Sequence, residues 1–289
     1  MLKKLFKYEW KEISKSLIIL HGIVLLFAVL TRISFAVSGG LNENSTIAGL
    51  FFFLSIMVIG TAAIFTVVFI GYRFYKDVFT DQGYLTNTLP VTPQQIIISK
   101  GLTGILWMVL DIIVVIAAIF IIMADKETFS NLSQLMKEVI GYLFHGRSLL
   151  TGCLIVATIV LTPFVSVLKM YVSVSIGSLL SGHKLLGSVG VYAGIYVVEQ
   201  IIMIITIAVT GNSFISSSLE SENAWEMQVT GVQIANTTMI INLIISLIIF
   251  IAGFFVTKYI MTKKLNLQQT RYLIVWKKFE YIYLLYYKN

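Results

Sequence analysis

The chain has few charged residues, few prolines and a single cysteine. Charged side chains make up 12% of its 289 residues, whereas a soluble domain carries about 25%. Apolar residues make up 57%, which is more than a water-exposed fold can bury. Cys153 lies inside an apolar run, so it supports neither a disulfide nor a thiolate metal site. This composition predicts an integral membrane protein with lipid as its solvent.

The sequence also lacks the motifs of common catalytic sites. It contains no G-x-x-x-x-G-K-[ST] phosphate loop, no H-E-x-x-H, no G-x-S-x-G and no cluster of Cys and His. The three histidines, His21, His145 and His183, belong to different layers of the membrane. The net charge of +7 does not indicate nucleic-acid binding, because the basic residues stand at the ends of apolar runs. We therefore expect a chain that is not an enzyme and holds no metal or cofactor of its own.

Six apolar stretches are long enough to cross a bilayer, which takes about 20 helical residues. They lie near residues 17–36, 47–72, 97–123, 149–170, 188–210 and 237–259. The first run is a retained span and not a signal peptide, since Glu9 and Glu12 precede it and no A-x-A site follows. We predict an all-α protein with one six-span transmembrane domain over residues 1–267.

Lysine and arginine are unevenly distributed between the two sides of these spans. All but four of the 21 fall on one side, Lys100 and Lys169 among them. The exceptions are Arg32, Lys126, Lys137 and Arg147. Because basic residues mark the cytoplasmic side, we expect a multi-pass protein of the cell membrane with both termini in the cytoplasm. An acidic loop at residues 211–236 is then outside.

A polar segment, TDQGYLTNTLPVTPQQ, separates the second and third spans at residues 80–95, and we call it the connector. Pro90 biases the residue before it away from helix. Thr92 is expected to cap the third helix, with Pro93 at its first position and Gln95 completing a capping box. Its aromatic and acidic residues suit a protein-contacting surface.

Three amphipathic segments flank the spans. Residues 2–16 separate apolar residues from lysines, which predicts an N-terminal interfacial elbow helix, either a plain anchor or one that also packs on the bundle. Residues 125–144 predict a short helix that caps the outer face of the bundle. Residues 268–289 carry an aromatic stripe beside basic residues, which predicts an interfacial tail in contact with membrane lipids.

Two carboxylates stand near the centres of apolar spans, Asp111 in the third and Glu199 in the fifth. A charged carboxylate there costs about 2.5–3.5 kcal/mol on insertion scales. Each either lines a polar or proton pathway, or is protonated or hydrogen-bonded as a link between helices. Candidate neighbours are Gln200, Thr158 and Asn242. We expect the linking role for Asp111 and packing for His21, and both roles stay open for Glu199. Separately, the spacing of Gly190 and Gly194 predicts close approach of another helix.

The stretch YRFYKDVFTDQGYLTNTLPVTPQQIIISK resembles the cytoplasmic segment of permease subunits of ATP-binding-cassette transporters from low-GC Gram-positive bacteria. In those subunits an aromatic-basic start leads to a D/E-x-G-Y-L-x-x-T-L-P-V-[ST]-P run. The matching residues are Asp81, Gly83, Tyr84, Leu85, Thr88, Leu89, Pro90, Val91, Thr92 and Pro93. The N-terminal MLKKLFKYEWKE, the SGHKLLGS turn and KKLNL look like the same family, so the resemblance covers about residues 1–267.

This resemblance implies a type-2 exporter, in which the chain is one half of a permease. The second half is identical or homologous, and two separate ATPase subunits bind ATP and Mg. A cytoplasmic coupling helix between the second and third spans would dock on the ATPase. The implied coupling residues are Asp77, Phe79, Asp81, Gly83, Tyr84, Leu85, Leu89 and Pro90. The resemblance also puts the second and fifth spans along the translocation path, which favours Glu199, and less so Asp111, as a substrate-path residue.

Family members of this size serve in antimicrobial-peptide export and bacteriocin immunity, and the apolar, aromatic-rich spans suit an amphipathic peptide or lipid-like substrate. Two alternatives stay open. One is an ion- or proton-driven carrier that uses Asp111 and Glu199. The other is a non-transporting peptide-binding module for immunity or sensing, whose acidic 211–236 loop attracts cationic peptides. Copurification with a separate ATPase is expected for the exporter, proton-coupled flux without ATP for the carrier, and immunity that persists with a catalytically dead ATPase for the binding module.

Overall fold

The computed structural model describes residues 2–38, 46–80, 82–83, 90–124, 126–144, 148–180, 182–220 and 224–264. Within these ranges all regular elements are helices. They are α1 (Leu2–Ser38), α2 (Thr46–Phe79), α4 (Pro93–Ile122), α5 (Lys126–Leu143), α6 (Leu149–Gly177), α7 (Lys184–Glu220), α8 (Ala224–Tyr259) and the short π-helix η2 (Ile260–Lys264). Every one of the six predicted spans lies in a helix that is long and apolar enough to cross a membrane. The protein is therefore an all-helical, multi-pass membrane protein.

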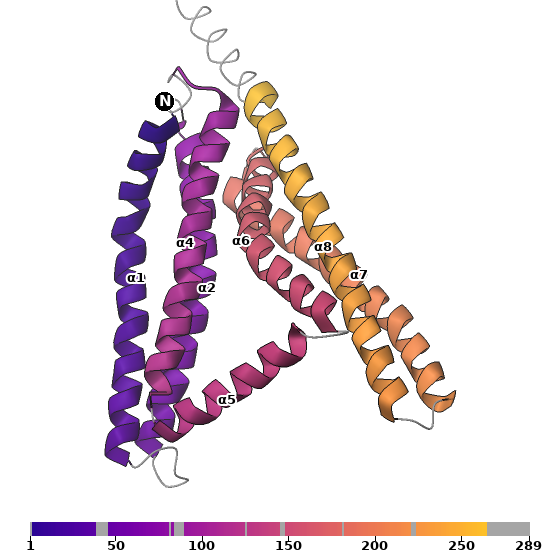
Figure 1. The fold of residues 1–289 in the computed structure, drawn as a ribbon. Helices are drawn as coiled ribbons and strands as arrows, with labels where there is room; N and C mark the ends of the chain where they lie inside the picture. Colours follow the sequence, from indigo (N-terminus) through magenta and orange to yellow (C-terminus); the bar gives the residue numbers. More distant parts are fainter. Residues whose placement is uncertain are drawn as a thin grey trace, which may run out of the picture.

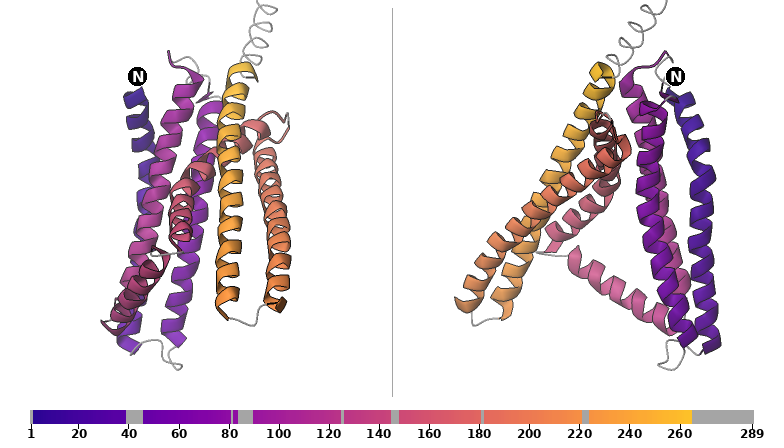
Figure 2. Two further views of the ribbon diagram at one scale, coloured as in Figure 1. Left: turned by 45° about the vertical axis from the view of Figure 1, so that its right-hand side comes forward. Right: turned by 180° about the vertical axis from the view of Figure 1, so that it is seen from behind.

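The six long helices form two groups of three (Figure 1). The first half consists of α1, α2 and α4, which run side by side, and the second half consists of α6, α7 and α8. The halves meet where α2 ends and α4 begins, which we call the connector end. They diverge toward the opposite end, where α5 lies between them (Figures 1 and 2).

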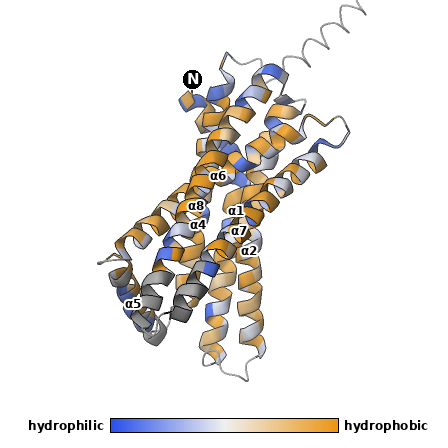
Figure 3. Ribbon diagram, turned by 90° about the vertical axis from the view of Figure 1, so that its right-hand side faces the viewer, coloured by the Kyte–Doolittle hydropathy of each residue, from blue (hydrophilic) through white to orange (hydrophobic). Residues whose placement is uncertain are grey.

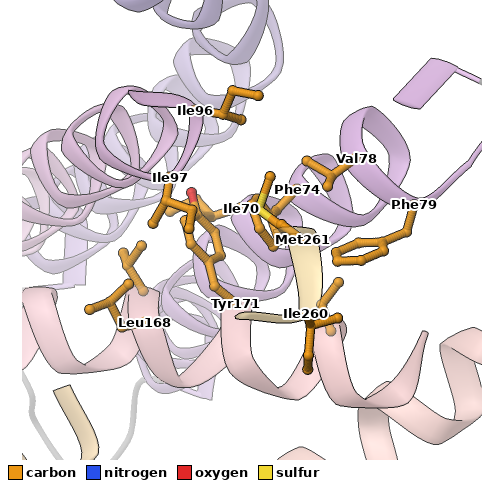
Figure 4. Packing of buried hydrophobic residues seen from close by; sticks show 12 residues of the cluster. Ile70, Phe74, Val78, Phe79, Ile96, Ile97, Leu168, Tyr171, Ile260 and Met261 are labelled. Atoms are coloured by element: carbon orange, nitrogen blue, oxygen red, sulfur yellow. The ribbon is translucent and has the colours of Figure 1, made fainter. Parts of the chain in front are cut away.

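One buried apolar cluster joins the halves at the connector end (Figure 4). Its members come from α2, α4, α6 and η2: Ile70, Phe74, Val78, Phe79, Ile96, Ile97, Val167, Leu168, Tyr171, Val174, Ile260 and Met261. The rings of Phe74 and Tyr171 stack at 3.9 Å between centroids. Gly104 lets α4 approach closely, because a Cβ there would lie 3.0 Å from Ile70 and 3.3 Å from Val167. Close packing across three helices therefore fixes the halves to each other at this end.

The long helices consist mostly of apolar residues (Figure 3), and many of their large apolar side chains are exposed. Large side chains such as Ile64, Ile204 and Ile248 are at least 60% exposed. In water such surfaces would drive aggregation, whereas in a bilayer they face acyl chains, and the helices satisfy their own backbone hydrogen bonds.

The N-terminal interfacial helix is not found as a separate element. Helix α1 continues without a break from Leu2 to Ser38. The reason is local, because residues 2–21 contain neither proline nor glycine and include many good helix formers such as Lys, Glu and Leu. Residues 2–16 thus extend the first span and pack on the other helices of the first half.

The segment at residues 211–236, predicted as a loop, is largely helical, so the prediction of a loop is wrong, whereas its location on the outer side stays a prediction. Helix α7 continues to Glu220, and α8 already begins at Ala224. The segment contains no proline, and nothing requires a helix to end where the hydrocarbon ends. The predicted tail at residues 268–289 lies outside the described residues.

Two packing expectations also differ from the structure. Helix α5 forms as predicted, but its apolar side chains Leu135, Met136 and Ile140 are about half exposed, so they do not cap a bundle. A Cβ at Gly190 or Gly194 would meet nothing within 4 Å. Close approach to α7 occurs instead at the connector end, where a Cβ on Gly177 of α6 would lie 2.2 Å from the backbone N of Ser188.

Candidate functional site

Five charged side chains form a network across the first half, near the connector end. Lys100 of α4 donates to Glu9 of α1 and, at 2.6 Å, to Asp77 of α2. Arg73 of α2 lies 2.6 Å from Glu12 of α1 and 3.4 Å from Asp77, one turn along its own helix. The side chains of Lys100 and Asp77 are only 6% and 12% exposed. The network therefore ties α1, α2 and α4 together in a place where unpaired charges would be costly.

The two helices of this network that flank the connector are α2 and α4. At the start of α4 the predicted capping box is present: the Thr92 hydroxyl accepts from the Gln95 backbone N–H, and the Gln95 side chain accepts from that of Thr92. At the end of α2, the Gly83 N–H donates to Thr80 O at 2.8 Å. A Cβ on Gly83 would lie 2.2 Å from Val78 O, so glycine is required by close approach to the end of α2.

The predicted coupling residues are distributed between interior and surface. Asp77 and Phe79 are buried, the first in the network and the second in the apolar cluster. Gly83 is buried as well, and Pro90 is exposed. The remaining members, Asp81, Tyr84, Leu85 and Leu89, lie outside the described residues. Asp77 and Phe79 thus contact other parts of this chain, and docking of the connector on a partner stays a prediction.

Asp111 pairs with His21 deep in the first half. His21 Nε2 lies 3.0 Å from Asp111 Oδ1, and Thr66 donates to the same oxygen at 3.5 Å. His21 Nδ1 is 2.6 Å from Leu17 O, a pure acceptor, so Nδ1 carries a hydrogen. The hydrogen bond between His21 Nε2 and Asp111 Oδ1 then contains one further proton. If that proton is on Nε2, the pair is an imidazolium and a carboxylate; if it is on Oδ1, both side chains are neutral. Both states have zero net charge, which explains how the pair is tolerated within a span.

A stack of rings leads from the connector end to this pair. Phe6 and Trp10 of α1 lie 6.1 Å apart, Trp10 and Trp107 of α4 lie 4.9 Å apart, and Trp107 lies 5.8 Å from His21. These rings fill the contact between α1 and α4. His21 is therefore more than a packing residue, because it combines ring stacking with the neutralisation of Asp111.

Glu199 pairs with Lys169 in the second half. Lys169 Nζ of α6 donates to Glu199 Oε2 of α7 at 2.7 Å, and it lies 5.6 Å from the centre of the Tyr192 ring. The pair opens on a cleft of about 330 Å³ between α6, α7 and α8. Polar residues that line this cleft include Thr162, Ser166, Gln200, Asn242 and Ser246. We call it the polar cleft.

Several sequence expectations change at these two pairs. The expected hydrogen-bond partners of Asp111 were polar residues of the second half, but α4 packs against α1 and α2 at that depth, so His21 and Thr66 take that place. Asp111 and Glu199 lie in different halves and do not share one pathway wall. Lys169, counted as a basic residue at a span end, lies about two turns inside α6 and neutralises Glu199.

Sequence reasoning missed the five-charge network, although one signal was present. Arg73 and Asp77 are spaced i, i+4 on one helix, which is the spacing of an intrahelical ion pair. The partners on α1 and α4 carry no such signal, because helix neighbours are not visible in sequence.

Comparison of the chain with known protein families, curated proteins and solved structures returns no match. Within the described ranges, no group of three or more His, Cys, Asp or Glu could hold a metal ion. A functional interpretation therefore depends on the connector, the charge network and the polar cleft.

Proposed function

We propose that the chain is the membrane-spanning permease subunit of an ATP-binding-cassette transporter. It exports an amphipathic peptide or lipid-like molecule, works with a second permease half, and is driven by two separate ATPase chains that bind ATP and Mg. Membrane-spanning character is established by six long apolar helices. The finer assignment is supported by the resemblance of residues 72–100 and by the charge network that joins α2 and α4, the two helices that flank the connector, to α1.

The five-charge network is the observation that carries the proposal. A partner that pushes on the connector acts on the last turns of α2 and the first turns of α4. Asp77 and Lys100 hold these turns together, and Lys100 also holds Glu9 of α1. Removing one partner of a buried pair costs about 3–5 kcal/mol, several times thermal energy. The first half therefore responds as one body to a movement of the connector, as a coupling device requires.

The proposal predicts that a neighbouring reading frame encodes a P-loop ATPase, and it is tested by coexpressing the chain with that ATPase. The variant combines Asp81→Ala, Tyr84→Ala and Leu85→Ala, because aromatic and apolar anchors carry most of the energy of an interface. We expect about a tenfold or larger loss of copurified ATPase. The matched control changes the segment between α1 and α2, at the opposite end, with Asn42→Ala, Glu43→Ala and Asn44→Ala. Full retention of the ATPase by the connector variant would overturn the proposal.

A proton-driven carrier is the second candidate, and one observation favours it. His21 and Asp111 share a proton inside a span, which is the chemistry of a proton relay. The purified chain in liposomes decides between the candidates: flux driven by a pH gradient without ATP, lost in Asp111→Asn, supports the carrier. Absence of such flux would count against the carrier and would not bear on the permease proposal, which the copurification experiment tests.

A further inference from the structure

The polar cleft has a composition that lipid-facing surfaces lack. Its residues lie on the membrane-spanning parts of α6, α7 and α8. Gln200 and Asn242 are exposed there, with side-chain amides that both donate and accept hydrogen bonds. Polar groups of this kind are costly in hydrocarbon, and within membranes they mark substrate pathways or contacts with polar groups. The cleft is therefore suited to a ligand that supplies hydrogen-bonding partners.

The charged pair in the cleft has zero net charge and remains accessible. The side chains of Lys169 and Glu199 are 13% and 22% exposed, with the 2.7 Å ion pair between them. A ligand with one charge could bind one member, but it would leave the other member unpaired in a region of low dielectric. A ligand with both charges can exchange the pair for two new pairs, and the site stays neutral throughout. Electrostatics thus selects zwitterions over lone ions.

We propose that the polar cleft binds the zwitterionic group of an amphipathic molecule, with its ammonium on Glu199 and its acidic group on Lys169. The volume of about 330 Å³ is at the lower end of small-molecule sites, which range from about 300 to 1,000 Å³. It therefore holds a polar group and not a whole lipid or peptide. The apolar part lies along the helices, whose exposed side chains at Ile205 and Ile244 are more than 50% accessible.

The inference rests on the proposed function in one respect: it takes the bound molecule to be the transported one. Binding itself involves only the described helices of this chain. It can be measured on the purified full-length protein without any ATPase.

The experiment compares four single-chain amphiphiles with the same acyl or alkyl chain in neutral maltoside micelles. Lysophosphatidylethanolamine is zwitterionic, lysophosphatidylglycerol anionic, an alkylamine cationic and a monoacylglycerol uncharged. Binding is measured by titration with native mass spectrometry. We expect the zwitterion to bind about tenfold tighter than the others, a difference of about 1.4 kcal/mol. Equal affinities, or no binding of the zwitterion, would overturn the inference.

Two single variants test which charge binds which group. Glu199→Gln leaves Lys169 unpaired, so we expect the anionic probe to become the tightest ligand. Lys169→Gln leaves Glu199 unpaired, so we expect the cationic probe to take that place. The control is Glu138→Gln on α5, a carboxylate that accepts from Gln134 on the same helix, and it should keep the wild-type order. Circular dichroism confirms that each variant keeps its helices.

The outcome separates this inference from the proposed function. If the zwitterion preference follows Lys169 and Glu199 but no ATPase copurifies, the permease assignment fails and the site stands. If the ATPase copurifies and the preference does not respond to these variants, Lys169 and Glu199 are a structural link between α6 and α7, and the inference fails alone.

Discussion

The two halves of the molecule use the same chemistry in different ways. In the first half, three carboxylates form ion pairs with one lysine and one arginine in a network that joins three helices, and the Lys100 side chain is 6% exposed. In the second half, one lysine and one carboxylate border a cleft. The buried Lys100 ammonium is shared by two carboxylates on two other helices and so joins three helices, whereas the Lys169–Glu199 pair lines a cleft that a ligand can enter. Under the two proposals made above, the first half would have a mechanical role and the second half a binding role.

Lys100→Met has the largest expected effect, because it leaves Glu9 and Asp77 together without their shared cation. We expect a loss of about 3–5 kcal/mol in the free energy of unfolding, measured by denaturation from detergent micelles. The control is Lys11→Met, an exposed lysine on α1, with an expected change within about 0.5 kcal/mol. A wild-type stability for Lys100→Met would mean that the network holds nothing together.

Gly177→Ala tests the close approach of α6 and α7 at the connector end. A Cβ there would lie 2.2 Å from backbone and not from a flexible side-chain end, so the helices must separate. The expected loss is about 1–3 kcal/mol, read as a lower thermal midpoint of helicity. Gly190→Ala is the matched control on α7, because its Cβ would meet nothing within 4 Å. Equal effects of the two changes would show that the close approach of Gly177 to α7 does not contribute to stability.

Lys169→Met sharpens the comparison between the halves. It removes a paired lysine from the second half, as Lys100→Met does from the first. Here water in the cleft can solvate the remaining Glu199, so we expect a smaller loss of about 1–2 kcal/mol. The two variants should be unfolded in the same micelles and compared directly. A larger loss for Lys169→Met than for Lys100→Met would reverse the roles assigned to the two halves.

Thr92→Ala removes the side-chain cap of α4 and should cost about 1 kcal/mol. Hydrogen exchange should rise in the first turn of α4 and stay unchanged around Asp111. Thr92→Ser retains a hydroxyl acceptor, so it should restore protection. If hydrogen exchange were unaffected by the loss of the hydroxyl, the Thr92 cap would not stabilise the first turn of α4.

Glu12→Gln is expected to have the smallest effect, although Glu12 lies 2.6 Å from Arg73. Its side chain is 58% exposed, and exposed pairs contribute about 0–1 kcal/mol. Arg73 also keeps Asp77 as a partner. Unfolding measured at low and high salt should show a small difference that salt removes. A loss comparable with that of Lys100→Met would place Glu12 among the enclosed members of the network.

The sequence predicted the existence of the helices better than it predicted where they begin and end. The spans and the Thr92 cap were predictable because length, hydropathy and capping are local properties. The bounds of α1, α7 and α8 were not, since a helix continues beyond an apolar run when no residue stops it. The connector's central residues lie outside the described ranges, so its coupling helix is still an expectation.

The candidate site was predictable in part. Asp111 and Glu199 stood out because a carboxylate inside an apolar span is costly. Their partners could not be found in the same way, since His21 is 90 positions from Asp111 and Lys169 is 30 from Glu199. Lys100 was misread as a charge that only orients the chain, because its burial between α1 and α2 is a property of packing.

By itself the sequence determined that six helices cross a membrane and that the third begins with a cap at Thr92. It also determined that two spans each carry a carboxylate in need of neutralisation. Only the tertiary structure decided which base neutralises which carboxylate, that three helices share an enclosed network, and that Glu199 borders a cleft. The reason is physical: hydropathy and capping act within one helix, whereas the burial and pairing of a charge depend on the helices that surround it.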